Sequence, residues 1–257
     1  MSTYNIVAAT SESTVVVEYV PIGKRSSEYQ SEAALENEFI SQLISQGYER
    51  VAIKSEREMV ANLRSQLEQL NQYRFSDNEW NRFFEQNIAS ANEGIVEKTR
   101  KIQEDHVQNL KCDDGATKNI RLIDKKNIHN NRLQVLNQYV APEGNYENRY
   151  DVTILVNGLP LVQVELKRRG VMLKEAFNQI DRYQRDSFWA GNALFEYVQI
   201  FVISNGTHTK YYSNTTRVSV EKEKEGGKRK TQKTSNSFEF TSFWADAGNK
   251  VIPDLVD

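Results

Sequence analysis

Two short stretches with apolar residues at every second position stand out near the middle of the chain. They cover residues 150–156 and 161–167, and Asn157 and Gly158 lie between them. A period of two is typical of a half-buried strand, and an Asn-Gly pair between two such runs is a strong hairpin signal. The pattern therefore predicts an antiparallel hairpin across residues 150–167.

The hydrophobic pattern also predicts the register of this hairpin. For the two valine-bearing faces to share one core, residues that pair across the strands must have numbers with an even sum. A three-residue loop over residues 157–159 satisfies this condition, whereas a two-residue turn would not. Because the even register pairs Val152 with Val164, it also sets Asp151 beside Glu165 on one face.

Two neighbouring carboxylates repel each other unless a cation lies between them. Mg²⁺ prefers oxygen ligands and commonly takes only one or two carboxylates from a protein. Lys167 lies one step beyond Glu165 on the same face, where it could orient an attacking water. Asp151, Glu165 and Lys167 therefore predict a metal-dependent phosphodiesterase site, and the alternative is that these acids simply face water.

A second acid-x-Lys triplet competes with this interpretation. It lies at residues 124–126, and residues 119–124 and 132–139 are predicted to be the strands of another hairpin. No acid stands at the matching position of a preceding strand, because the nearest acids belong to the turn-like sequence at 113–115. The later site is therefore favoured.

The segment 31–46 has its apolar residues on one stripe at helical spacing, with Ser31 as the expected cap. Glu36 falls near the centre of this stripe and Glu32 lies close to it, whereas Glu38 points away. An acid on the buried side of a helix needs a partner. Glu36 is either a ligand or support of the metal, or an ordinary ion-pairing group at the edge of the core.

Helical periodicity continues over residues 56–102, which are predicted to be a helical insertion packed on the sheet. A further helix is expected over 171–185, and an interior strand over 196–204. Gln179 and Tyr183 share one face of that helix and could reach the end of the acid-bearing strand. The alternative for both residues is a polar helix edge.

The composition is that of an ordinary globular protein of 257 residues, enough for one large domain. A net charge of −2 gives no general attraction to DNA, so any contact must be local. A single cysteine, no signal sequence and no apolar run of roughly 18 residues favour a cytoplasmic location without a membrane span. Residues 221–236 are predicted to be a flexible charged loop, and the chain is expected to be the N-terminal part of a longer protein.

The order of helix, strands, acid-bearing hairpin, helix and strand resembles the nuclease fold with the PD-(D/E)xK signature. Asp151, Glu165 and Lys167 take the signature positions, and Tyr150 stands in place of the proline. The resemblance implies an α/β fold of the restriction-endonuclease type, with a mixed central sheet flanked by helices.

Two further features extend the resemblance. Gln179 and Tyr183 resemble the Q-x-x-x-Y element of the RecB-like branch, and Glu36 resembles the helix acid that many members carry. A closer likeness than that to the superfamily is to the N-terminal nuclease domain of type I restriction enzyme R subunits. It is carried by three stretches, NRYDVTILVNGLPLVQVELKRRG, EAFNQIDRY and FVISNGT.

This resemblance implies an Mg²⁺-dependent endonuclease acting on double-stranded DNA, with Gln179 and Tyr183 in the catalytic set. It also implies ATP-driven motor domains further along the chain, and methyltransferase and specificity subunits as partners. No ATP-binding motif occurs here. The alternatives are a repair or junction nuclease of the same fold, or a non-catalytic docking module. Five basic residues are the predicted DNA contacts: Arg168, Arg169, Lys174, Arg182 and Arg185.

Overall fold

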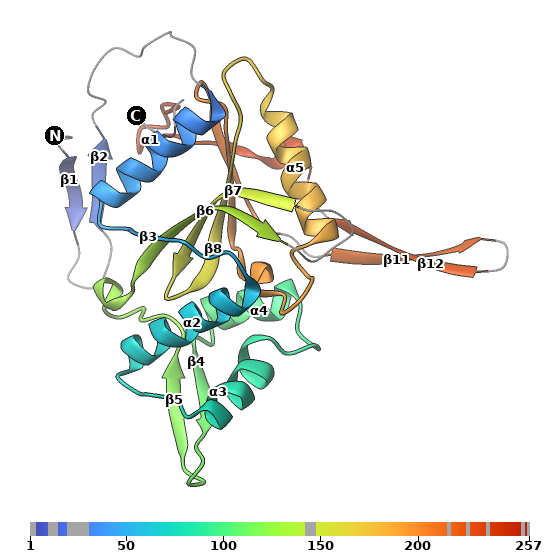
Figure 1. Cartoon of the computed structure of the whole chain (residues 1–257). Coiled ribbons are helices and arrows are strands. Elements are labelled where there is room, and N and C mark those ends of the chain that lie inside the picture. The colour runs from blue at the N-terminus through green and yellow to red at the C-terminus, as the bar shows by residue number, and fades with distance from the viewer. Residues whose placement is uncertain are drawn as a thin grey trace.

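The computed structural model describes residues 31–141, 148–214, 237–252 and 255, and the backbone alone of residues 4–9, 15–19, 217–224 and 227–234. These residues form one seven-stranded sheet, three two-stranded hairpins and several helices (Figure 1). The large sheet contains both parallel and antiparallel pairs and is flanked by helices. The predicted α/β class with a mixed central sheet is therefore confirmed.

The predicted hairpin lies at the centre of the large sheet. Neighbouring strands pair in the order β13 (Ser242–Phe243), β10 (Thr209–Ser213), β9 (Ile200–Ser204), β8 (Leu159–Leu166), β7 (Asn148–Val156), β6 (Leu133–Ala141) and β3 (Glu49–Val51). β6, β7 and β8 are antiparallel to one another, whereas β9 is parallel to β8 and β3 is parallel to β6. The predicted interior strand is confirmed as β9, but residues 194–197 form a short 3₁₀ turn before it.

Helix α1 (Glu32–Ser45) covers one face of the sheet, and the hydroxyl of Ser31 caps it as predicted. Its buried residues pack against Val152 and Val164 of the hairpin. Side chains alternate across a strand, so the neighbouring apolar residues Leu155 and Leu161 face the other way, into a second core. The sheet is thus packed on both faces.

The second core contains the predicted helical block. Its elements are α2 (Glu56–Asn71), α3 (Asp77–Phe83), a π-helical turn η1 (Phe84–Ile88) and α4 (Ile95–Gln103). Helix α5 (Leu173–Asp186) follows the hairpin and buries its apolar residues in the same core. Within the part of the chain that the structure describes, none of the helices is long and apolar enough to cross a membrane.

The predicted second hairpin is wrong. β5 (Thr117–Arg121) pairs with β4 (Val107–Lys111), and β6 pairs with β7 instead. A tight turn joins β4 to β5, in which Gly115 has a φ of 87° and the N–H of Cys112 donates to Ala116. This local turn brings the two strands together before the chain reaches residues 132–139.

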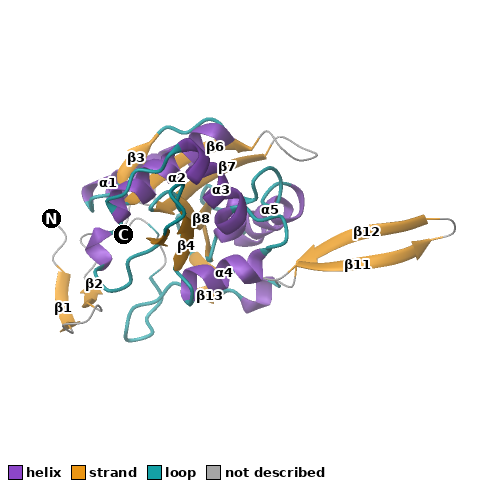
Figure 2. Ribbon diagram, turned by 90° about the horizontal axis from the view of Figure 1, so that it is seen from below, coloured by secondary structure: helices purple, strands orange, loops and turns teal. Residues whose placement is uncertain are grey.

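The predicted flexible loop over 221–236 is also not what the structure shows. β11 (Arg217–Lys224) and β12 (Gly227–Thr234) pair along their whole length, and residues 225, 226, 235 and 236 lie outside the described residues. Figure 2 shows the pair as a ribbon that extends away from the rest of the molecule. The backbone register sets Glu221 opposite Lys230 and Glu223 opposite Lys228.

The turn between β7 and β8 differs from the predicted three-residue loop. Only Asn157 and Gly158 lie between the paired residues Val156 and Leu159, and their φ values are 50° and 83°. Two positive φ values are typical of a type I′ turn. The buried side chain of Asn157 accepts a hydrogen bond from the N–H of Arg132, which ties the turn to the preceding segment.

A β-bulge restores the predicted register nearer the site. The pairing shifts by one residue next to Leu155, because Leu161 of β8 has no partner in β7. The shift returns Val152 to Val164, as predicted. The two carboxylates therefore share a face through a turn and a bulge rather than through a longer loop.

We expect Gly158→Ala to destabilise the fold by about 2–4 kcal/mol. The alanine would have to adopt the left-handed φ of Gly158, and its Cβ would collide with the backbone of α2. A Cβ at this position would lie 2.6 Å from the Cα of Leu63 in α2. Urea unfolding would measure the loss. Gly115→Ala is the matched control, because its φ of +87° is similar but no atom lies within 4 Å. It should lose only about 1–2 kcal/mol, and equal losses in both variants would contradict the close packing of α2 on the turn.

Candidate active site

The hairpin brings Asp151 and Glu165 together. Asp151 lies near the beginning of β7 and Glu165 near the end of β8. The Oδ2 of Asp151 accepts a hydrogen bond from the N–H of Leu166 at 2.9 Å, which fixes it next to the other strand. Glu165 is 0% exposed, because β7 and β9 flank its strand and both faces of the sheet are packed. The predicted carboxylate pair is therefore present.

Lys167 follows the end of β8, where its N–H still bonds to Ser204 of β9 at 2.8 Å. Its Nζ lies 3.1 Å from Oε1 of Glu165, and its side chain is 13% exposed. Burial acts to lower the pKa of Lys167, but attraction by Glu165 and Asp151 outweighs burial and raises it. The site thus holds a charged ammonium group against the carboxylates.

Both carboxyl groups of the pair hold their protons more strongly than free acids do. Burial is the largest cause in each, and it raises the pKa of Glu165 well above its ordinary value. The charge of Asp151 raises the pKa of Glu165 further, while Lys167 acts in the opposite direction. The pKa of Asp151 is also raised by burial, although the Leu166 N–H partly offsets this.

One oxygen of Glu165 is left without a hydrogen bond. Its Oε2 is buried and has no partner among the described residues, and a buried polar atom without a partner is costly. In the same part of the chain, no three His, Cys, Asp or Glu side chains form a metal-binding group. An ion here would therefore use two carboxylates and complete its shell with backbone oxygens and water, as Mg²⁺ accepts. The residues present fit such an ion.

Glu36 is the helix acid that the structure buries, with 7% of its surface exposed. Its Oε1 accepts a hydrogen bond from Asn137 at 2.8 Å, and its other oxygen accepts one from the amide of Gln138. Burial raises the pKa of Glu36, and the two amides act to lower it. The predicted placement of Glu36 is confirmed, whereas its role with a metal stays a prediction.

Glu32 also lies near the pair, at the first turn of α1. Its Oε1 accepts a hydrogen bond from the N–H of Arg168 at 3.3 Å, and its charge contributes to the raised pKa of Asp151. Glu38 is exposed. The two acids of α1 that approach the site are therefore Glu32 and Glu36.

Asn137 and Gln138 were not anticipated as site residues. Gln138 has a left-handed φ of 54° and lies between two regular pairs of β6 and β7, at the level of Asp151. This conformation costs a non-glycine residue about 1–2 kcal/mol, and such strain is concentrated at functional sites. The only sequence signal was two adjacent amides that interrupt the apolar pattern of β6 between Leu136 and Tyr139.

Gln179 and Tyr183 lie beside the pair, as predicted, and contact each other. The side chain of Gln179 donates to the hydroxyl of Tyr183, which donates to the carbonyl of Arg149 at 2.6 Å. Burial and the charge of Glu165 raise the pKa of Tyr183. Tyr183 therefore holds the strand just before Asp151.

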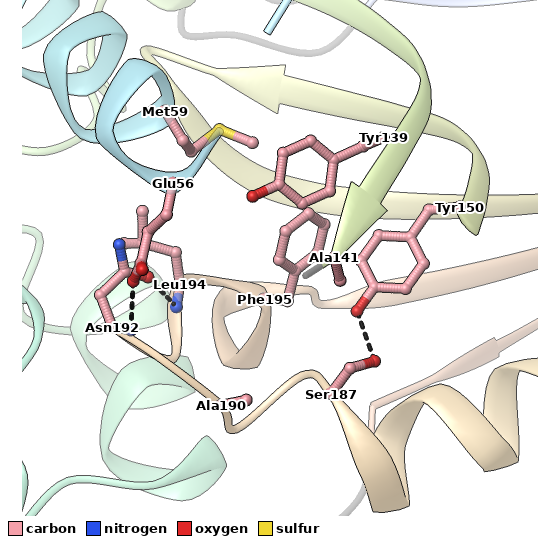
Figure 3. Close-up of a pocket in the computed structure, with 10 residues that line it drawn as sticks. All are labelled: Glu56, Met59, Tyr139, Ala141, Tyr150, Ser187, Ala190, Asn192, Leu194 and Phe195. Carbon is pink, nitrogen blue, oxygen red and sulfur yellow. Dashed lines mark hydrogen bonds between the residues drawn. The ribbon is translucent and has the colours of Figure 1, made fainter. Parts of the chain in front are cut away.

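Tyr150, which stands at the signature's proline position, has a structural role. Its hydroxyl lies 2.6 Å from Oγ of Ser187, and its ring packs on Tyr183 at 4.8 Å between centroids. Figure 3 shows it beside a cavity of about 30 Å³ that also borders Phe195 and Met59. That volume holds one or two waters, so the cavity is not a substrate pocket.

The predicted basic residues lie on α5 and the loop before it. Arg185 forms an ion pair with Asp181 at 3.2 Å, and Arg182 lies over the ring of Tyr183 at 5.5 Å. Their contact with DNA stays a prediction. Of the five basic residues, Arg169 is partly buried. The other four are exposed, namely Arg168, Lys174, Arg182 and Arg185.

The competing triplet has a structural role instead. Asp124 is 5% exposed and accepts hydrogen bonds from the N–H groups of Lys126 and Asn127 and from the amide of Asn130. These bonds lower the pKa of Asp124 and organise a loop. The choice of the later triplet as the site is consistent with this geometry.

Comparison with known proteins assigns a family to this arrangement. Residues 29–220 match the family model described as "Type I restriction enzyme R protein N terminus". The "Type I restriction enzyme EcoprrI endonuclease subunit" of Escherichia coli is 46% identical over 252 residues, which is 98% of this chain and 75% of that protein.

More distant relatives are much longer than the chain. The "Type I restriction enzyme SauMSSORF170P endonuclease subunit" of Staphylococcus aureus is 42% identical over 187 residues, which is 72% of this chain but 20% of that protein. The "Putative type I restriction enzyme MjaIXP endonuclease subunit" of Methanocaldococcus jannaschii is 36% identical over 105 residues, or 38% of the chain and 10% of that protein. The chain thus spans about one fifth of the staphylococcal relative.

Removing the charge of Glu165 should stabilise the metal-free fold at neutral pH. Because its pKa is raised on folding, the stability of the wild type falls as pH rises from the ordinary pKa to the raised one. Glu165→Gln cannot ionise, so its advantage should grow over that window, as measured by urea unfolding in EDTA between pH 4 and 8.

Glu79→Gln is a control of opposite sign. Hydrogen bonds from the N–H groups of Ser76 and Asp113 lower the pKa of Glu79, so its carboxylate adds stability above the ordinary pKa and loses it as pH falls. That variant should be less stable than wild type at neutral pH. Parallel responses of the two variants would contradict the raised pKa of Glu165.

Proposed function

This chain belongs to the type I restriction enzyme R protein family, and on that premise we propose that its carboxylate pair is the active site of a metal-dependent DNA endonuclease. The observation that carries the proposal is the fully buried Glu165, which lies beside Asp151 and Lys167 with one oxygen unpartnered. Two buried carboxylates beside a single ammonium group are costly for the fold unless a further cation joins them.

Asp151 and Glu165 would hold the ion, and bound Mg²⁺ would polarise the phosphoryl oxygen and lower the pKa of a bound water. Asp151 is already oriented for this by the N–H of Leu166. Lys167 would orient the attacking water and stabilise the charge that develops on the phosphate. Its raised pKa keeps it protonated for that second role.

Tyr183 and Gln179 would support this centre from α5. Tyr183 fixes the backbone at Arg149, two residues before Asp151, and Gln179 is partly exposed and could reach DNA. Exposed basic residues on the same helix would contact phosphates without reading bases. That suits a nuclease whose recognition sequence is chosen elsewhere.

The longer relatives suggest the setting. We propose that the chain acts on double-stranded DNA in the cytoplasm, ahead of ATP-driven motor domains and together with methyltransferase and specificity subunits. ATP would bind the motor, since this chain has no ATP-binding motif. The rival proposal is a docking module that keeps the hairpin only for its structure, and it requires neither a metal nor the charge of Asp151.

In an R subunit that carries this chain, loss of a site residue should lower DNA cleavage at least about 10²-fold, because each residue acts on the reacting phosphate. Gel analysis of supercoiled plasmid would measure it. Lys126→Ala, the equivalent lysine of the other triplet, is the matched control and should cut like wild type. Normal cutting by Asp151→Asn would overturn the assignment. The site variants for which this loss of cleavage is expected are Asp151→Asn, Glu165→Gln and Lys167→Ala.

Mn²⁺ should raise the thermal unfolding midpoint of the wild-type chain and leave the Asp151→Asn/Glu165→Gln double variant unchanged. A ligand at 100 times its Kd stabilises a fold by about 2.7 kcal/mol, which calorimetry resolves. An equal shift in both proteins would favour the docking module, because the ion would then bind elsewhere.

A further inference from the structure

A groove of about 660 Å³ lies at the ends of β3 and β6. β3 pairs with only residues 134–136 of β6, while β6 continues to Ala141. Beyond Val51 the chain leaves the sheet, and residues 52–54 form the opposite wall of the groove. The last part of β6 therefore has an open side.

The directions of the strands place the groove and the candidate active site on one rim of the sheet. β3 runs parallel to β6, and β6, β7 and β8 alternate in direction. The C-terminal ends of β3, β6 and β8 therefore meet the N-terminal end of β7, which carries Asp151. Two strand spacings separate β3 from β7, or about 10 Å. Each strand of a duplex carries one phosphate for about every 3.4 Å of the duplex axis, so a duplex whose axis follows the rim has about three phosphates of one strand over this distance.

Two cations line the groove without an acidic partner. Arg50 and Lys54 are both exposed, and neither forms an ion pair with any described residue. Arg50 donates one hydrogen bond, to the amide oxygen of Asn137 at 3.2 Å. Both side chains are therefore open to an anion from outside the chain. Arg185, by contrast, is neutralised by Asp181 on its own helix.

The remaining polar wall separates the groove from Glu36. Asn137 and Gln138 line the groove, and both donate to the Glu36 carboxylate, which is not itself part of the lining. A second acid, Glu58, accepts a hydrogen bond from the backbone N–H of Lys54 at 2.7 Å. The polar part of the lining thus consists of cations and amide groups, which are the groups that bind a phosphodiester, and the rest of the lining is apolar: Val51, Ala52, Ile53 and Val140.

We propose that this groove binds backbone phosphates of the DNA strand within about three nucleotides of the scissile phosphate, with Arg50 and Lys54 as the contacting cations. The proposal rests on the proposed DNA endonuclease function and adds a binding site to it. Contacts of this kind hold the strand across the rim while carrying no sequence information. They would also connect DNA binding to Glu36 through Asn137.

The salt dependence of DNA binding tests this site. Binding of a short duplex to the chain would be measured by fluorescence anisotropy in EDTA, so that no cutting occurs, starting at about 50 mM salt. Each lost phosphate contact lowers the slope of log affinity against log salt by about 0.9. Arg50→Gln/Lys54→Gln should therefore lower the slope by about 1.8, and Lys54→Gln alone by about 0.9.

The control removes the same charge at another place. Lys111 lies at the end of β4 and Lys126 lies in the loop after β5, and both are exposed. Lys111→Gln/Lys126→Gln should leave the slope unchanged. Arg50→Lys should keep it as well, which would show that charge and not folding is measured. Circular dichroism checks that each variant is folded. Lys54→Gln alone keeps the test valid if Arg50→Gln unfolds, because the Lys54 side chain is exposed and forms no hydrogen bond or ion pair with the described residues.

Equal slopes for the two double variants would overturn the inference, as would the absence of any DNA binding at low salt. Failure of the proposed function has a different signature, namely normal cutting by Asp151→Asn. Loss of cutting in that variant together with an unchanged slope after removal of Arg50 and Lys54 would retain the nuclease and reject the groove.

Discussion

The burial of the Glu165 carboxylate is the constraint on which the site depends. Taking an ionised carboxylate out of water costs several kcal/mol unless charges and hydrogen bonds replace the solvent. Here Lys167 supplies one charge and contacts only one of the two oxygens. A second acid, Asp151, lies beside it and adds repulsion. The fold tolerates this because packing holds the two strands in place, and the result is a centre suited to a divalent cation.

The packing that imposes this constraint comes from both faces of the sheet. On one face α1 presses on Val152 and Val164. On the other, α2 approaches the hairpin turn so closely that only glycine fits at position 158. The bulge at Leu161 then sets which residues of β8 face the second core. A defect in any of these would turn Glu165 away from Asp151, since a shift of one residue reverses every side chain of a strand.

The rim of the sheet combines two kinds of polar surface. At β7 and β8 it carries acids that suit a metal. At β3 and in the segment after it, the rim carries Arg50 and Lys54, which suit phosphates. Asn137 lies between them and contacts both Glu36 and Arg50. In the proposed function, this division of charge would allow a chain with a net charge of −2 to meet DNA locally without a general attraction to polyanions.

Local periodicity was enough to predict the hairpin, the acid pair and the buried position of Glu36, because the side-chain direction in a strand or helix follows from spacing alone. It did not predict the turn and bulge, the pairing of β5, the β11–β12 hairpin or the left-handed Gln138. Each of these depends on contacts between segments distant in sequence or on cross-strand pairing that composition does not show. The sequence by itself thus determined that Asp151, Glu165 and Lys167 lie together, although it did not point to Asn137 and Gln138. Only tertiary packing decided how they are held, because the energy of a turn, a bulge or a strained residue is set by its neighbours in space.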